Sequence, residues 1–196
     1  RRLIALAFVA GMLAVPLVIP FEKAASDYFD GGALVFIIWA IVEELAKFIV
    51  AWIIVLRRKE VDEPIDALIY MITVALGFSA IEKSLFILAP IAGGDAIGAL
   101  VTGNLRFIGA TLLHVISSSA IGAAMALAFY QSAKIKKGFI VVGVILSIGL
   151  HTIFNLLIIK SSYNGGTFFV FLSVWLVVAV LMVVFEKVKS LAKKYY

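Results

Sequence analysis

Hydrophobic residues run along this chain in long, nearly unbroken blocks that are separated by short polar connectors. A helix that crosses a bilayer needs roughly 20 mainly apolar residues, and the blocks have about that length. Gly, Pro, Asn and Ser in the connectors are typical of helix ends. The pattern therefore predicts an all-α membrane protein with about six transmembrane helices, near residues 3–20, 33–56, 65–89, 105–130, 138–159 and 167–185.

The composition favours lipid over water as the surroundings of this bundle. Of the 196 residues, 64% are hydrophobic and 15% are charged, whereas a soluble domain is about 45–50% apolar. We find no internal repeat and no low-complexity tract, so residues 1–196 are predicted to form a single polytopic membrane domain. The chain has no cysteine, which excludes disulfides and cysteine-ligated metals.

The basic residues indicate how the bundle is oriented. Lysine and arginine in short loops gather on the cytoplasmic side of a membrane. The other side would hold only Lys23, Arg106 and Lys160. Both termini are therefore predicted to be cytoplasmic, and the net charge of +5 reflects these loops, so no nucleic-acid partner is expected. The side predicted as cytoplasmic holds Arg1, Arg2, Arg57, Arg58, Lys59, Lys134, Lys136, Lys137, Lys187, Lys189, Lys193 and Lys194.

A small set of ionisable residues falls inside the predicted helices, where an ionised side chain costs about 2.5–3.5 kcal/mol. This cost predicts that the set converges in the interior of the bundle. At the helical rise per residue, the members on four helices lie about 10–16 Å from the outer helix ends, so they share one level. The set consists of Glu43, Glu44, Lys47, Glu82, Lys83, His114 and His151.

Local spacing adds detail to this polar layer. Glu43 and Lys47 are four residues apart and share a helix face. Glu44 points about 100° away from Glu43, so the two glutamates need not have the same role. His151 and Asn155 are also four residues apart, which places both on one face of the fifth helix.

Two imidazoles and several carboxylates at one level suit more than one kind of chemistry. Zinc binds imidazole nitrogen and carboxylate oxygen, and a catalytic site leaves one position for water. Without a metal, a buried glutamate could deprotonate water while histidine and asparagine stabilise the oxyanion. Both routes hydrolyse a peptide bond. The alternative is a proton or cation path, although the inverted repeats of many transporters are not evident.

Four short motifs stand in order on separate predicted helices. The first is EELAK at residues 43–47, and the second is DALIYMITVALGFSAIEKS at 66–84, with Asp66, Tyr70, Gly77, Phe78 and Glu82. The third, RFIGATLLHVISSSAIGAA, covers 106–124, and the fourth, HxxxN, covers 151–155. Over about residues 40–160 they resemble the PrsW family of intramembrane proteases, which is related to the CAAX-processing (CPBP/Abi-type) membrane endopeptidases.

Two positions qualify the resemblance. The lysine of the first motif favours the PrsW pattern, EExxK, over the EExxxR pattern of the CAAX enzymes. The asparagine that usually follows the glutamate of the second motif is replaced here by Lys83. Lys83 could pair with Glu82 or Asp95 instead.

The resemblance implies an integral protein of the prokaryotic cell membrane that cleaves membrane-protein or peptide substrates within the lipid bilayer. It implies site-1-type cleavage of anti-sigma-factor-like substrates, near the outer face. The family is described both as metalloproteases and as glutamic-type proteases. The oligomeric state is not indicated by the sequence.

We therefore predict an intramembrane endopeptidase of metallo or glutamic type. Glu43 is predicted to be the general base, Glu44 a ligand or partner, and Asn155 the oxyanion donor. One divalent metal, zinc as first choice, would bind His114, His151, Glu44 and Glu82, and a metal-free glutamic mechanism is the alternative. The predicted catalytic residues are Glu43, Glu44, His114, His151 and Asn155, supported by Lys47 and Glu82.

Three other functions fit the same sequence less well. The first is a CAAX-type prenyl-protein endopeptidase. The second is a proton- or cation-coupled transporter that uses the same Glu, His and Lys cluster. The third is a catalytically inactive binding or immunity protein, for which Lys83 is the one indication.

Overall fold

The structure of the chain is a computed structural model. It describes residues 1–29, 31–94, 96–164 and 167–195. Within these helices, side chains are described except at residues 89–90, 96–108, 159–164, 167–169, 171 and 192–195.

The described residues form six long α-helices and one π-helical turn, which confirms the predicted all-α fold. The first helix is longer than predicted, because it continues past Pro20 to Tyr28. The elements are α1 (Arg2–Tyr28), α2 (Ala33–Ala51), η1 (Trp52–Leu56), α3 (Pro64–Ala92), α4 (Ala96–Leu127), α5 (Ala133–Asn164) and α6 (Thr167–Tyr195).

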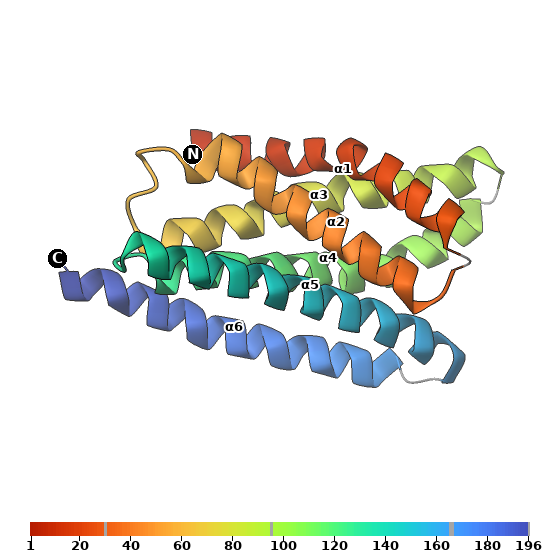
Figure 1. The fold of residues 1–196 in the computed structure, drawn as a ribbon. Coiled ribbons are helices and arrows are strands. Elements are labelled where there is room, and N and C mark those ends of the chain that lie inside the picture. Colours follow the sequence, from red (N-terminus) through yellow and green to blue (C-terminus); the bar gives the residue numbers. More distant parts are fainter. Residues whose placement is uncertain (30, 95, 165–166, 196) are drawn as a thin grey trace.

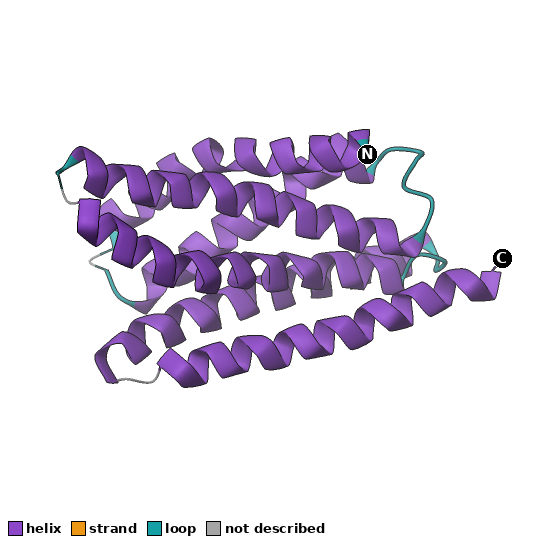
Figure 2. Ribbon diagram, turned by 180° about the vertical axis from the view of Figure 1, so that it is seen from behind, coloured by secondary structure: helices purple, strands orange, loops and turns teal. Residues whose placement is uncertain are grey.

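The helices run side by side along one common direction (Figure 1). The N-terminus and the C-terminal end of α6 lie at the same end of the bundle, which agrees with an even number of crossings. Helix α3 packs against α1 and α4, helix α5 packs against α2 and α4, and α6 covers the outside of α4 and α5. Seen from behind, the loop of residues 57–63 lies beside the N-terminus (Figure 2).

Among the described residues, four helical segments are long and apolar enough to cross a membrane, namely Arg2–Tyr28, Pro64–Leu88, Gly109–Leu127 and Ala133–Ile158. Helix α2 is not one of these four apolar segments, because it carries three charged residues, Glu43, Glu44 and Lys47. All three are buried inside the bundle, where they meet partners instead of lipid. Their cost in the membrane is therefore lowered by contacts with neighbouring helices.

Helices α1 and α3 touch along their backbones at two reciprocal glycines. A Cβ atom added at Gly11 would lie 2.0 Å from the carbonyl oxygen of Val74. A Cβ atom added at Gly77 would lie 2.0 Å from the carbonyl oxygen of Phe8. Small residues allow such close packing in membranes, so the second motif uses Gly77 to bring α3 against α1.

Candidate active site

Four helices direct polar side chains to one place inside the bundle. Helix α2 supplies two glutamates and a lysine, α3 supplies Glu82, α4 supplies His114 and α5 supplies His151. The two imidazole rings lie 5.0 Å apart and nearly perpendicular. Both histidines are 2% exposed or less, so the two imidazoles are shielded from the surroundings of the bundle.

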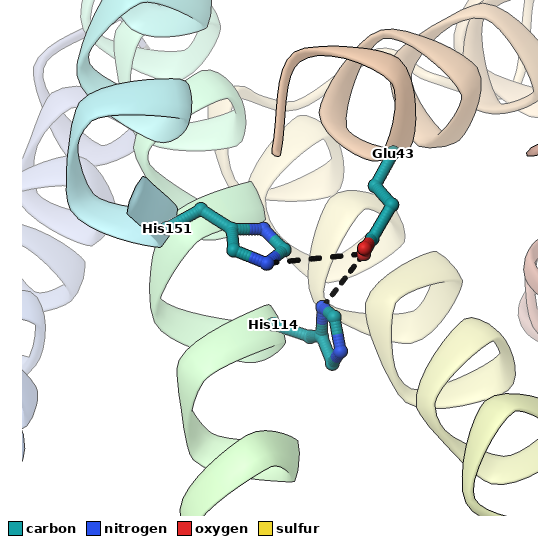
Figure 3. A group of neighbouring side chains, drawn as sticks. All are labelled: Glu43, His114 and His151. Carbon is teal, nitrogen blue, oxygen red and sulfur yellow. Dashed lines mark ion pairs between the residues drawn. The ribbon is translucent and has the colours of Figure 1, made fainter. Parts of the chain in front are cut away.

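The carboxylate of Glu43 faces both imidazole rings (Figure 3). Its Oε2 atom is 3.6 Å from Nδ1 of His114 and 3.8 Å from Nε2 of His151. Among the described side chains, this buried oxygen is one of two polar atoms without a hydrogen-bond partner. A buried carboxylate oxygen without a partner is costly, which indicates that the space between these groups is built to receive a ligand or water.

A carboxylate holds the second nitrogen of each ring. Glu82 Oε2 lies 2.9 Å from Nε2 of His114, and Glu44 Oε1 lies 2.7 Å from Nδ1 of His151. An imidazole that donates its N–H to a carboxylate presents a lone pair at its other nitrogen. Both lone pairs are then on the side of Glu43.

Glu44 is the most heavily bonded group of the centre. Ser118 and Ser147 donate hydrogen bonds of 2.8 and 2.7 Å to Oε2, while Lys47 and His151 donate to Oε1. A carboxylate has about four lone-pair positions, and all are used here. Ser147 was missed in the sequence, although it precedes His151 by one helical turn on the same face.

Lys47 bonds to the second glutamate more closely than to the first. Its Nζ atom is 2.5 Å from Oε1 of Glu44 and 3.7 Å from Oε2 of Glu43. It also lies 3.0 Å from Nδ1 of His114 and 4.5 Å from the centre of the Phe78 ring. The ammonium group therefore lies between both glutamates and one imidazole and offsets the negative charge.

Lys83 braces two helices near the centre. Its Nζ atom donates a hydrogen bond of 2.6 Å to Oγ of Ser79 and a second one to Oγ1 of Thr111. The bond to Thr111 joins α3 to α4, one residue after Glu82, which holds His114. The suggested partner Asp95 and the side chain of Arg106, in the third motif, lie outside the described residues.

Asn155 follows His151 by one turn of α5, as predicted, and its side chain is half-buried. It is therefore more accessible than the histidine. The role that the sequence predicts for this amide, as a donor to an oxyanion, stays a prediction.

Glu22 is a further carboxylate at this centre, and it was missed in the sequence. It belongs to the part of α1 beyond Pro20 and lies within hydrogen-bonding reach of Glu43. The indole Nε1 of Trp39 donates a 3.0 Å hydrogen bond to the backbone oxygen of Glu22, which ties α1 to α2 there. The available signal was a glutamate just after a long apolar run.

The donor atoms at the centre fit a divalent metal. One carboxylate oxygen of Glu43 and one nitrogen from each of His114 and His151 all lie within 4.8 Å of one another. Zinc accepts this mixture of oxygen and nitrogen ligands. Carboxylates behind ligating imidazoles, the positions of Glu44 and Glu82, are usual at such sites.

This grouping differs from the metal set predicted from the sequence. The carboxylate that faces both rings belongs to Glu43, whereas Glu44 and Glu82 contact the rings at their other nitrogens. The Nδ1 atom of His114 is also the atom that Lys47 approaches to 3.0 Å. A metal on this nitrogen and the contact with Lys47 exclude each other.

Comparisons with known proteins agree with these features. Residues 1–185 match the sequence model of a family described as PrsW family intramembrane metalloprotease. The Protease PrsW of Shouchella clausii (strain KSM-K16) is 26% identical over 145 residues, 73% of this chain and 63% of that protein. The Protease PrsW of Geobacillus kaustophilus (strain HTA426) is 38% identical over 58 residues, 30% of this chain and 26% of that protein. The matched region thus covers less than two thirds of either relative, and no solved structure matches the chain.

Proposed function

Because this chain belongs to the PrsW family of intramembrane metalloproteases, we propose that it is an intramembrane endopeptidase that hydrolyses peptide bonds of membrane-protein substrates. One observation carries the proposal. The buried Oε2 atom of Glu43 has no hydrogen-bond partner and lies within 4 Å of a nitrogen of both His114 and His151. A free carboxylate oxygen facing two imidazoles is a suitable place to activate water.

In the proposed reaction Glu43 is the general base. The water oxygen forms a bond with the carbonyl carbon of the substrate, and the proton of the water moves to Oε2 of Glu43. The same proton then moves to the amide nitrogen as the bond between carbon and nitrogen breaks. One O–H of the water remains, and Nε2 of His151 orients the water by accepting this hydrogen bond, while Nδ1 of His114 faces Glu43 and contacts Lys47.

The surrounding residues hold this arrangement in place. Glu82 orients His114 and Glu44 orients His151 through the bonds at their second nitrogens. Lys47 offsets the charge of both glutamates. We propose the amide of Asn155 as the hydrogen-bond donor to the oxygen of the tetrahedral intermediate, because it is half-buried and one turn from His151.

As the metal-dependent alternative to this metal-free reaction, we propose that Glu43, His114 and His151 are the residues that would hold a divalent metal, with zinc as first choice. When bound, the metal would supply a Lewis acid for the scissile carbonyl and would lower the pKa of water. This proposal replaces Glu44 and Glu82 of the set predicted from the sequence with Glu43.

The proposed substrates are membrane proteins of a bacterial cell membrane, because both matched relatives come from bacteria. Anti-sigma-factor-like proteins cut near the outer face remain the proposed class. The position of Glu82 supports this, since it lies nearer the end of α3 than its start and thus away from the predicted cytoplasmic side.

The test is cleavage of a single-span reporter in proteoliposomes, with fragments identified by mass spectrometry. Glu43→Gln should lower the rate at least about 100-fold, since general base catalysis contributes that much. Glu186→Gln is the matched control because Glu186 is exposed on α6 and pairs only with Lys189 among the described residues. Full activity of a folded Glu43→Gln protein would exclude the base assignment.

The same proteoliposomes distinguish the proposed protease from a transporter. A proton or cation flux that needs Glu43, without any cleavage of the reporter, would favour transport. A reporter ending in a prenylated CAAX sequence tests the remaining enzymatic alternative, and preferential cleavage of that reporter would favour a CAAX-type endopeptidase.

A further inference from the structure

A second polar site lies at the end of the bundle that holds the N-terminus, away from the catalytic centre. It is a cavity of about 350 Å³ lined by Arg1, Arg2, Leu3, Arg58, Glu60 and Tyr70. Three arginines therefore face one space from segments far apart in the sequence. Tyr70 and Glu82 are twelve residues apart on α3, which separates the two sites by about 18 Å.

The fold builds this cavity through the loop that follows η1. Asp66 Oδ2 accepts hydrogen bonds of 3.2 and 3.1 Å from the backbone N–H groups of Asp62 and Glu63. These bonds hold the loop against the start of α3. Tyr70 follows Asp66 by one turn and is 8% exposed. The second motif thus places two of its residues here and not at the catalytic centre.

Arg58 is partly fixed before any ligand arrives. Its Nε atom donates a 2.6 Å hydrogen bond to the carbonyl oxygen of Ile54, in the π-helical turn η1. The two terminal nitrogens of the guanidinium are then free to bind a ligand. A pre-oriented guanidinium loses less freedom on binding, so it binds an anion more strongly.

The charge of the lining selects an anion. Three guanidinium groups face a single carboxylate, that of Glu60. The planar donor pattern of arginine matches the oxygens of a phosphate group. The phenol of Tyr70 can donate a further hydrogen bond, and Glu60 can accept one from a hydroxyl group of the same ligand.

The position of the cavity favours a lipid as the source of this phosphate. It lies at the helix ends that carry most of the basic residues, on the side predicted to be cytoplasmic, where anionic lipids concentrate. Leu3 forms an apolar wall of the cavity. Ile4 and Phe8 follow on α1 and are 47% and 37% exposed, so an acyl chain can run along that helix.

We propose that this cavity, here called the arginine pocket, binds the phosphodiester headgroup of an anionic phospholipid with free hydroxyl groups. The phosphate contacts the guanidinium groups and the phenol of Tyr70. The hydroxyl groups of the headgroup contact Glu60, and the acyl chains lie against α1.

The test is native mass spectrometry of the full chain in a neutral detergent, titrated with phosphatidylglycerol. Arg58→Ala should weaken the first binding event by about tenfold, the loss expected for one charge-assisted hydrogen bond. Arg57→Ala is the matched control, because Arg57 is the neighbouring residue, has the same charge and does not line the cavity. The Arg57→Ala substitution should change the affinity less than about twofold, the effect expected from the loss of one exposed charge.

Three results would overturn the proposal. Equal losses in the Arg58→Ala and Arg57→Ala proteins would mean that general surface charge binds the lipid. Equal binding of phosphatidylcholine would exclude selection of an anion. Displacement of the lipid by the same concentration of glycerol 3-phosphate would show that the pocket takes a soluble phosphate. Thermal unfolding of both variants confirms that each is folded.

Discussion

Glu82 and His114 are joined by a contact of 2.9 Å between Oε2 and Nε2, and Glu82 is the more exposed of the two carboxylates that hold the imidazoles. Its side chain is 22% exposed, whereas that of Glu44 is fully buried. Two similar contacts therefore have different surroundings. We infer that Glu82 chiefly orients its ring, while Glu44 also supports the fold.

Glu82→Gln should separate these two roles. The amide keeps the size of the side chain but removes the charge behind His114. Loss of such a partner typically costs 10- to 100-fold in activity or metal affinity, so we expect the rate of reporter cleavage to fall by about that factor. The melting temperature should change little, because the site of substitution is partly exposed.

Glu44→Gln should instead destabilise the protein. The change leaves Lys47 buried without its closest partner, and breaking a buried pair costs about 3–5 kcal/mol. Unfolding in detergent, followed by circular dichroism, measures the loss. Glu186→Gln, at an exposed position, is the control and should stay within about 0.5 kcal/mol of the natural protein. Equal stabilities of the two variants would contradict the role of Glu44 in the fold.

Lys47→Met should strengthen metal binding. Methionine has a similar length without charge, so the ammonium no longer competes for Nδ1 of His114. Charges about 4 Å apart interact by several kcal/mol at a protein-like dielectric, and we expect zinc affinity to rise at least about tenfold. Competition with a coloured chelator measures this independently of activity. Weaker zinc binding by a folded variant would argue against a metal at this nitrogen.

Glu22→Gln tests the carboxylate that α1 contributes. The change alters the hydrogen bond to Glu43 but leaves the backbone contact with Trp39 in place. We expect the cleavage rate to change by about tenfold, the worth of one hydrogen bond to a charged group. Asp27→Asn on the same helix is exposed and should cleave at the natural rate. Equal behaviour of the two variants would remove Glu22 from the site.

Gly77→Ala should destabilise the bundle without touching the polar centre. The added methyl group would lie 2.0 Å from the carbonyl oxygen of Phe8, which forces α1 and α3 apart. Overpacking of this kind costs about 1–3 kcal/mol. Gly138→Ala on α5 is the control, because nothing lies within 4 Å of its added Cβ atom. A helix usually gains stability when a glycine is replaced by alanine. The two variants should therefore change the free energy of unfolding in opposite directions.

The sequence predicted the helices and the level of their polar residues better than it predicted the partners. An intramembrane charge must be paired, which limits where such residues can lie. The choice between partners depends on helix rotation, which local spacing does not determine. Lys47 shares a face with Glu43, yet it bonds more closely to Glu44.

The end of α1 shows a second feature that the sequence pattern does not predict. The apolar run ends near residue 20, which predicts that the first helix ends there. In the structure Pro16 and Pro20 both lie inside α1. Neighbouring helices can satisfy the backbone groups that a proline frees in a membrane. The predicted connector after residue 20 therefore includes Glu22, although this residue belongs to a helix that reaches the centre.

The four hydrogen bonds on Glu44 also bear on how the protein is made. Its partners Ser147 and His151 lie 103 and 107 residues further along the chain. Helix α2 therefore leaves the ribosome long before α5, and until then its Glu44 has only Lys47 and, once α4 has been made, Ser118 as partners from this set of four. We expect α2 to remain in contact with water or the insertion machinery and to insert fully into the lipid bilayer only after α5 has been synthesised. The final assembly of this bundle would then be a late, concerted step, and its timing would depend on the carboxylate of Glu44.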